Sequence, residues 1–230
     1  TSAWPSDEPS ACTCAVGESM QFDMAELGVR DRYKLIAGLI VPRPIALVST
    51  VSPDGRANAA PYSFFNAFAE EPPIVILGLG RQASGSAKDT TNNIRDVGEF
   101  VVNLVDERIA EAMNVTSIDF PPEISEIDVA GFTLEPSVKV KPGRIVEAPV
   151  SLECRRYVTL QPGPERYIAL GEVLMIHVRD GIVDPVKLRV DRDVYHPIGR
   201  LYGSGYCHTH DRFELPRETY ESWKRDRRSG

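Results

Sequence analysis

The sequence lacks the features that mark several large classes of protein. Its 230 residues include only four cysteines, too few and too widely spaced for a disulfide framework. No stretch approaches the roughly 18 apolar residues of a membrane-spanning helix, and no basic segment followed by an apolar core marks a secretory signal. Acidic residues (33) outnumber Lys and Arg (26), and the net charge of -7 argues against nucleic acid or an anionic membrane as the main partner. We therefore expect a cytoplasmic protein that binds neither.

Familiar catalytic and metal-binding signatures are also missing. The chain has no G-x-x-x-x-G-K-[ST] phosphate loop and no G-x-G-x-x-G after a strand. Gly203-Ser204-Gly205 does not match the G-x-S-x-G pattern of serine hydrolases. Segments 12–14 (C-T-C) and 207–210 (C-H-T-H) contain metal-binding residue types, but neither has a second group of ligands near it in the sequence. We therefore expect no metal site.

Composition divides the chain into three parts. Residues 1–19 are rich in Ser, Ala, Pro and acidic residues, which predicts a flexible N-terminal arm. Organised sequence begins at Met20, and residues 20–210 are long enough to form one domain with a hydrophobic core. Residues 211–230 predict a helical tail that begins near Pro216.

The segment 41–80 contains the clearest local pattern. An apolar run over 45–51 is followed by Ser52-Pro53-Asp54-Gly55, a favourable turn sequence, and by a second extended run over 56–62. These features predict a β-hairpin. It ends in Ser63-Phe64-Phe65-Asn66, a loop that could place backbone N–H groups and an amide around a flat polar ligand.

The remaining pattern is mostly strands with few helices between them. We expect helices over 24–40 with Asp31 as a possible N-cap, over 89–98 with Asp89 or Thr90 as N-cap, after Asp106, and near the C-terminus. We expect strands over 74–79, 99–105, 138–140, 150–160 and 167–178, with a connector over 68–73 and a long loop over 114–131. This order favours a mainly β protein with peripheral helices, built as an antiparallel barrel, over a doubly wound parallel sheet.

Two groups of polar residues are candidates for a site. Ser84, Ser86, Lys88, Asp89 and Thr90 lie where a helix begins, and with Arg81 they would suit a phosphate, because a helix N-terminus offers free N–H groups. The alternative is a capped surface helix with a solvated lysine. His196 lies in a cluster with Arg200 and Tyr202 and has either a catalytic or a structural role, whereas we expect His177 to be a core or interface histidine.

Several motifs in the right order resemble the flavin reductase-like proteins of the FMN-binding split-barrel class. They are P-R-P-I-A-L-V-S-T (42–50), N-A-A-P-Y-S-F-F-N (58–66), E-P-P-I-V (71–75), K-D-T-T-N-N-I (88–94) and E-F-V-V-N-L-V (99–105). The resemblance implies a six-stranded antiparallel split β-barrel with Greek-key connections. It also implies a homodimer that binds one FMN, rather than FAD, per subunit near the interface. The phosphate would lie at Lys88, Asp89 and Thr90. The flavin ring and ribityl chain would lie along Pro44, Ile45, Val48, Ser49, Thr50, Ala60, Pro61, Tyr62, Ser63 and Asn66, with Arg81 and Ser86 near the phosphate.

The activity that this resemblance implies is an NAD(P)H:flavin reductase, with hydride passing from nicotinamide C4 to flavin N5. Arg43 could stabilise the reduced flavin, or could instead pair at the dimer interface. His196, Arg200 and Tyr202 would line the substrate side, and a partner monooxygenase could receive the reduced flavin. Two alternatives remain open: a flavin-dependent oxygenase or other redox enzyme with its own small organic substrate, covered by the loop 114–131, and a non-catalytic FMN-binding electron carrier.

Overall fold

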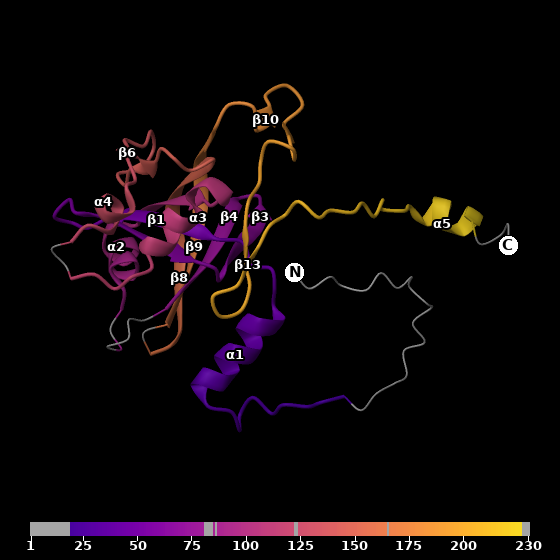
Figure 1. Cartoon of the computed structure of the whole chain (residues 1–230), viewed down its shortest axis with the longest axis horizontal. Helices are drawn as coiled ribbons and strands as arrows, with labels where there is room; N and C mark the ends of the chain where they lie inside the picture. Colours follow the sequence, from indigo (N-terminus) through magenta and orange to yellow (C-terminus); the bar gives the residue numbers. More distant parts are fainter. Residues whose placement is uncertain (1–18, 81–84, 86, 122–123, 165, 227–230) are drawn as a thin grey trace, which may run out of the picture.

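The computed structural model describes residues 19–80, 85, 87–121, 124–164 and 166–226. Its centre is one sheet of seven strands in the order β2-β1-β5-β8-β9-β4-β3, in which every pairing is antiparallel (Figure 1). The strands are β1 (Ala46–Val51), β2 (Ala57–Tyr62), β3 (Phe65–Glu70), β4 (Pro73–Leu79), β5 (Glu99–Leu104), β8 (Val150–Gly163) and β9 (Arg166–Val178). Three short ladders pair β6 (Leu134–Glu135) with β7 (Arg144–Ile145), β10 (Val183–Asp184) with β11 (Arg189–Val190), and β12 (Gly199–Arg200) with β13 (Tyr206–Cys207).

Short helices surround this sheet. They are α1 (Val29–Leu39), α2 (Asp89–Val97), the 3-10 helix η1 (Glu107–Ile109), α3 (Ala110–Val115), α4 (Glu126–Ala130) and α5 (Tyr220–Asp226). Figure 1 shows α1 standing away from the sheet, and α5 at the far end of an extended C-terminal segment. Across the part of the chain that the structure describes, no helix is both long and apolar enough to cross a membrane.

The expected mainly β, antiparallel class is confirmed, but the strand count is wrong. The sheet has seven strands rather than six, because β3 forms where we expected a loop and a connector. β3 is an edge strand, and only Phe65 at its start is buried, so it lacks the alternation of apolar residues that marks a strand. The predicted strand over 138–140 is also wrong. There the N–H groups of Val138 and Lys139 donate to the Glu153 carboxylate instead of to a neighbouring strand.

Helix starts differ from the predictions for local reasons. α1 begins after Gly28, and Asp31 pairs with Lys34 at 2.6 Å instead of capping the helix. The N-cap of α2 is Lys88, rather than Asp89 or Thr90 as expected. Gly98 ends this helix in the left-handed conformation, with φ of 78°. The tail helix begins at Tyr220 rather than near Pro216. At this start Thr219 and Ser222 exchange hydrogen bonds.

The predicted hairpin is confirmed as the pair β1–β2. Gly55 has φ of 89°, and its N–H donates to the Ser52 carbonyl at 2.9 Å, which closes the turn. The segment 114–131 is not wholly a loop, because it contains the end of α3 and the short helix α4. The N-terminal arm lies outside the described residues apart from Ser19, as do Cys12 and Cys14.

Two apolar clusters lie on opposite faces of the sheet. The first takes side chains from all seven strands and from α2, including the fully buried Phe100 and Leu77. The second joins β1 and β2 to α3, α4 and β7, and includes Met113 and Ile127. β1 contributes to both, Val48 to the first and Leu47 to the second. Because successive side chains of a strand point to opposite faces, a strand buried on both sides reads as the continuous apolar run seen in the sequence.

Candidate functional site

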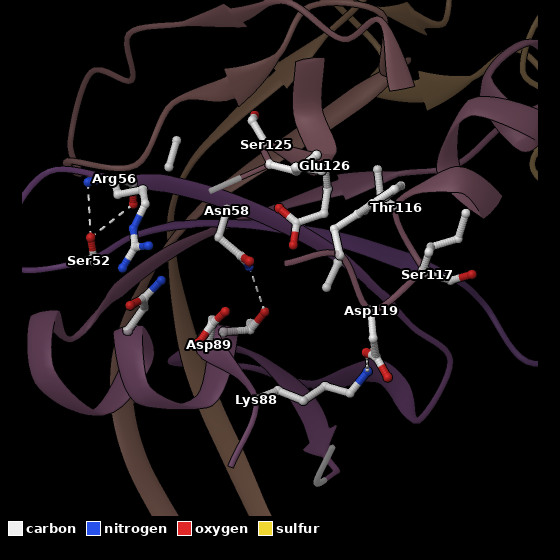
Figure 2. A pocket seen from close by; sticks show the side chains of 17 residues that line it. Ser52, Arg56, Asn58, Lys88, Asp89, Thr116, Ser117, Asp119, Ser125 and Glu126 are labelled. Carbon is white, nitrogen blue, oxygen red and sulfur yellow. Dashed lines mark hydrogen bonds and ion pairs between the residues drawn. The ribbon is translucent and has the colours of Figure 1, made fainter. Parts of the chain in front are cut away.

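A polar cavity of about 750 Å³ lies between β2, the N-terminus of α2 and residues 116–120 and 124–126. Its volume falls within the range of roughly 300–1,000 Å³ that is usual for small-molecule sites. Figure 2 shows Lys88 extending from α2 toward Asp119, and Glu126 facing Asn58 from the opposite side. We call this the polar cavity. The polar lining residues discussed below are Asn58, Lys88, Asp89, Thr90, Asp119 and Glu126.

The start of α2 supplies the anion-binding character of this cavity. Among the described residues no side chain caps the helix, so its first N–H groups remain available to a ligand. The Lys88 ammonium lies 4.0 Å from Asp119, a separation at which an ion pair is weak. Thr90 is fixed from β2, because its hydroxyl accepts a hydrogen bond from the Asn58 amide at 3.0 Å. Lys88, the helix end and Thr90 therefore present one set of donors suited to a phosphate.

The pKa values of two titratable groups beside this helix are raised. Burial raises the pKa of Glu126, and the charge of Asp89 acts in the same direction. Burial also raises the pKa of Tyr62 to about 12, with the Thr90 hydroxyl acting in the opposite direction. The Tyr62 phenol is therefore protonated at neutral pH.

A second, apolar cavity of about 400 Å³ lies where α1 meets β4 and the end of the β2 strand. We call this the apolar cavity, and its argued lining residues are Ile36, Ile40, Arg43, Ser63, Phe64 and Asn66. Of the described residues that line it, Arg43 is the charged one. Its walls suit a flat, largely apolar group, with the Ser63 hydroxyl and the Asn66 amide at hand for polar edges.

Arg43 is already engaged with the protein. Its guanidinium donates to the carbonyl oxygens of Ala37, of Ile40 (2.8 Å) and of Leu201 (3.0 Å), and its Nε lies 3.4 Å from the Ser63 hydroxyl. Two of these carbonyls lie at the C-terminal end of α1, where a positive charge is favourable. This geometry favours a positioning role over the catalytic role expected from the sequence.

The other predicted cofactor residues fall into four groups. Ala60, Lys88, Asp89 and Thr90 line the polar cavity, whereas Pro44, Ser63 and Asn66 line the apolar cavity. The side chains of Ile45, Val48, Ser49, Thr50 and Tyr62 are buried, and the half-buried Pro61 is in β2. Ser49 donates to the Gly143 carbonyl, and Thr50 accepts from Asn93, so their hydroxyls are in use within the protein. Arg81 and Ser86 lie outside the described residues.

The predicted substrate residues lie on β12 or within a few residues of it. The main chain of Arg200 pairs with that of Arg43, and its guanidinium lies over the Tyr206 ring at 4.5 Å. Tyr202 is exposed in the turn between β12 and β13, and the His196 ring contacts His210 with centroids 4.6 Å apart. None of the three predicted residues is among the described residues that line either cavity. His177 is only partly buried, and it bonds to the buried Glu153 at 2.6 Å.

Sequence reasoning missed one wall of the polar cavity. Thr116, Ser117, Phe120 and Glu126 reach it from the segment 116–126, opposite the helix start. The length of the predicted loop over 114–131 was the one indication of this wall, and from the sequence we connect that loop only with a redox enzyme that has its own organic substrate. Asn58 belongs to one of the family motifs, but its hydrogen bond to Thr90 could not be predicted because the two residues are distant in the sequence.

Comparison with known proteins identifies the family. The sequence profile described as "Flavin reductase like domain" matches residues 38–199, most of the chain. The chain belongs to this family. The resemblance inferred from the motifs is thereby confirmed, and the antiparallel sheet is that of the flavin reductase-like split barrel.

Individual relatives cover nearly the whole domain. An uncharacterized protein of Aquifex aeolicus is 45% identical over 187 residues, which is 81% of this chain and 94% of the relative. The structure of Pseudomonas fluorescens 2-nitrobenzoate 2-nitroreductase NbaA is 40% identical, with a TM-score of 0.80 over 87% of this chain and 98% of that one. Nitrilotriacetate monooxygenase component B from Bacillus cereus is 34% identical, with a TM-score of 0.81 over 86% and 99%. Family and relatives together support a flavin-related oxidoreductase.

Proposed function

We propose that this protein is an NAD(P)H-dependent flavin reductase that binds FMN. The observation that carries the proposal is the polar cavity at the uncapped start of α2, in a chain of the flavin reductase-like family. A phosphate needs N–H donors and a cation, and the first turn of α2 with Lys88 and Thr90 supplies both. The residues present therefore fit the phosphate of FMN.

The protein's part in the reaction is binding, orientation and exclusion of water. When bound, the flavin would accept hydride at N5 from nicotinamide C4. Lys88 and the helix end would hold the phosphate, and residues 116–120 and 124–126 would cover it. The walls of the apolar cavity would take a flat ring, and Arg43 would keep α1 in place as one of those walls. A protein of this kind needs no nucleophile, because the cofactor carries the chemistry.

The proposal includes a homodimer. Along α1 the side chains of Val29, Tyr33, Ile36, Leu39 and Ile40 are all exposed, a larger apolar face than one surface helix usually leaves to water. Ile36 and Ile40 also line the apolar cavity, so a partner subunit on this face would complete that cavity. A bound flavin would then lie near the interface. A partner monooxygenase that receives reduced flavin is supported by the name of the Bacillus cereus relative, a monooxygenase component B.

A second candidate is a flavin-dependent reductase with its own organic substrate, such as a nitroaromatic acid. The 40% identical nitroreductase supports it. However, an aromatic carboxylate needs a cation with free donors, and the guanidinium nitrogens of Arg43 already bond to protein oxygens. A third candidate is a non-catalytic electron carrier. NAD(P)H would reduce the flavin of such a carrier slowly, whereas it would reduce the flavin of a reductase rapidly.

Turnover measurements separate these candidates. Flavin-loaded protein is mixed anaerobically with NADH or NADPH in a stopped-flow instrument, and bleaching of the flavin absorbance is followed. We expect rapid bleaching by at least one nucleotide and continued NAD(P)H consumption when free FMN and oxygen are supplied. Consumption that depends on added 2-nitrobenzoate would favour the second candidate. Absence of reduction by either nucleotide at millimolar concentration would refute a reductase.

The phosphate site is tested by replacing Lys88 and Thr90 with alanine. Loss of a charge-assisted hydrogen bond of about 1.5–3 kcal/mol corresponds to roughly 10- to 100-fold weaker FMN binding, measured by fluorescence titration. Riboflavin, which has no phosphate, should bind the variant and the native protein equally. Lys187→Ala, at an exposed lysine away from the cavity, is the matched control. An equal loss of FMN and riboflavin affinity would show that the substitutions damage the fold rather than a phosphate site.

A further inference from the structure

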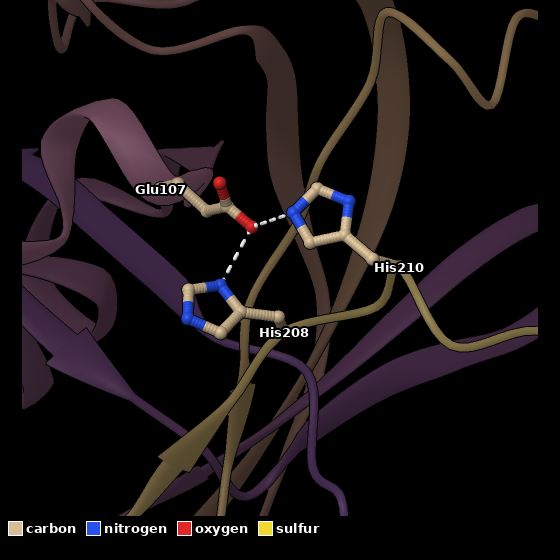
Figure 3. Close-up of side chains that lie close together, drawn as sticks. All are labelled: Glu107, His208 and His210. Atoms are coloured by element: carbon tan, nitrogen blue, oxygen red, sulfur yellow. Dashed lines mark hydrogen bonds and ion pairs between the residues drawn. The ribbon is translucent and has the colours of Figure 1, made fainter.

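Three side chains with metal-binding atoms meet outside both cavities. The Nδ1 of His208 lies 2.7 Å from Oε1 of Glu107, and the Nε2 of His210 lies 2.6 Å from the same oxygen. Figure 3 shows both imidazole rings turned toward the glutamate. The ligand atoms of all three residues lie within 4.8 Å of one another. With His196 beside His210, three of the four histidines of the chain gather at this point.

Hydrogen bonds and an ion pair outside the three ligand side chains bring these residues together. The N–H of Glu107 donates to the His196 carbonyl at 3.2 Å, and the Thr209 hydroxyl donates to the Pro197 carbonyl at 2.8 Å. Asp106, the residue before the glutamate, caps η1 and pairs with Arg179 at 2.9 Å. Segments 105–107, 196–198 and 208–210 are therefore held side by side by bonds that do not involve the three ligand atoms.

The spacing of the two histidines suits a shared ligand. His208 and His210 follow directly after β13 at positions i and i+2, and in extended chain such residues point to the same side. An ordinary surface ion pair joins one cation to one carboxylate oxygen. Here two imidazole nitrogens from neighbouring positions converge on one oxygen of a glutamate 101 residues away in the sequence.

The geometry is close to that of a zinc site. With ligand distances of roughly 2.0–2.1 Å, tetrahedral ligands lie about 3.3 Å apart, so each imidazole needs to move back by less than about 1 Å. His208 and His210 have the freedom to do so, because their side chains are 71% and 51% exposed. Zinc takes neutral imidazole, so on binding each of these two nitrogens would offer its lone pair to the ion.

We propose that Glu107, His208 and His210 bind one divalent transition-metal ion, for which Zn²⁺ is the probe. Two imidazoles and one carboxylate form a ligand set typical of zinc and its neighbours in the first transition row. Three protein ligands leave a coordination position open to water or to an external ligand. The ion would tie the chain after β13 to η1. The sequence predicted no metal site because Glu107, the third proposed ligand, is distant in the sequence from His208 and His210.

The test is Zn²⁺ binding to tag-free, metal-stripped full-length protein, measured by competition with a chromophoric chelator. We expect one Zn²⁺ per chain and a raised melting temperature, because an ion that binds only the folded state stabilises it. Glu107→Gln, His208→Ala and His210→Ala should each weaken binding by about 10-fold or more. Co²⁺ should give the intense visible bands of a tetrahedral site in the native protein and not in these variants.

Matched controls exclude other ligands and misfolding. A variant with Ser at Cys12, Cys14 and Cys207 removes the thiols that could bind Zn²⁺ and should keep the native affinity. Far-UV circular dichroism checks that each variant folds, and Glu107→Gln keeps an oxygen that can accept hydrogen bonds from both rings. Failure of the native protein to bind Zn²⁺ would overturn the proposal. So would unchanged affinity in the three ligand variants, or loss of binding in the triple serine variant.

Discussion

Replacing Arg43 with methionine tests whether this residue positions α1 or takes part in the reaction. Arg43 is 7% exposed, and its guanidinium joins the end of α1 to the chain beyond β12 through the carbonyls of Ala37, Ile40 and Leu201. The last turn of α1 has no basic residue of its own, so Arg43 is the cation at this helix end. Methionine keeps much of the aliphatic length and removes every donor.

The expected loss follows from the surroundings of the three carbonyls. Ala37 is 1% exposed, so its carbonyl would be left buried without a partner, which costs about 1–3 kcal/mol. The carbonyls of Ile40 and Leu201 are only partly buried and can regain water, so each should lose about 0.5–1.5 kcal/mol. We expect Arg43→Met to destabilise the protein by about 2–6 kcal/mol. Lysine should lose less, because it keeps the charge but reaches fewer carbonyls than the planar fork does.

Urea unfolding followed by circular dichroism, at fixed protein and flavin concentrations, measures this loss. Amide hydrogen exchange should show the N–H groups of α1 losing protection first. Arg30→Met, at an exposed arginine on the same helix, should stay within about 0.5 kcal/mol of the native protein. If Arg43→Met left stability unchanged while turnover collapsed, the positioning role would be wrong and the catalytic role expected from the sequence would stand.

Two further predictions concern the sheet. A Cβ added at Gly171 would overlap with Cζ of the fully buried Phe100, so Gly171→Ala should destabilise the protein by about 1–3 kcal/mol in urea unfolding. Adding Phe100→Leu should recover part of this loss, and strict additivity of the two substitutions would contradict a steric cause. Burial raises the pKa of Glu153, but hydrogen bonds from Val138 N–H, His177 and Lys139 N–H outweigh it and leave the pKa below its ordinary value of 4.5. The stabilisation from the ionised Glu153 carboxylate is therefore complete above pH 4.5, and it is lost as the pH falls through the lower pKa of the folded state. The difference in melting temperature between native and Glu153→Gln protein should be constant near neutrality and should shrink in acid. A difference that does not depend on pH would exclude this role.

The parts of the fold that the sequence predicts are those determined locally. The β1–β2 turn needs only Pro53 and Gly55 at the right positions, and the end of α2 needs only Gly98 in a left-handed conformation. The apolar residues at the start of β1 predict a strand that is buried on both faces. In each case the deciding interactions lie within a few residues of one another.

Features that depend on distant residues could not be predicted in this way. β3 is a strand because β4 pairs with it, although its own residues are mostly exposed. The Asn103 amide is a buried hub that bonds to Leu47, Ser49, Ile145 and Ser151, and nothing in the sequence near it indicates those partners. The predicted cofactor residues divide between two cavities for the same reason, since each cavity forms where segments far apart in the chain meet.

The state of α1 connects the proposed flavin site with the proposed homodimer. A free helix of 11 residues is marginal in water, and α1 together with its C-cap residue Ile40 leaves five apolar side chains exposed. Besides the burial of Ala37 and the contact of Tyr33 with Phe64, two contributions would hold α1 in the proposed dimer: the Arg43 bonds at its C-terminal end, and the partner surface that would cover its apolar face. Since Ile36 and Ile40 belong both to this face and to the apolar cavity, loss of either contribution would open the cavity as well as loosen the helix. We therefore infer that flavin affinity and subunit association depend on the same contact.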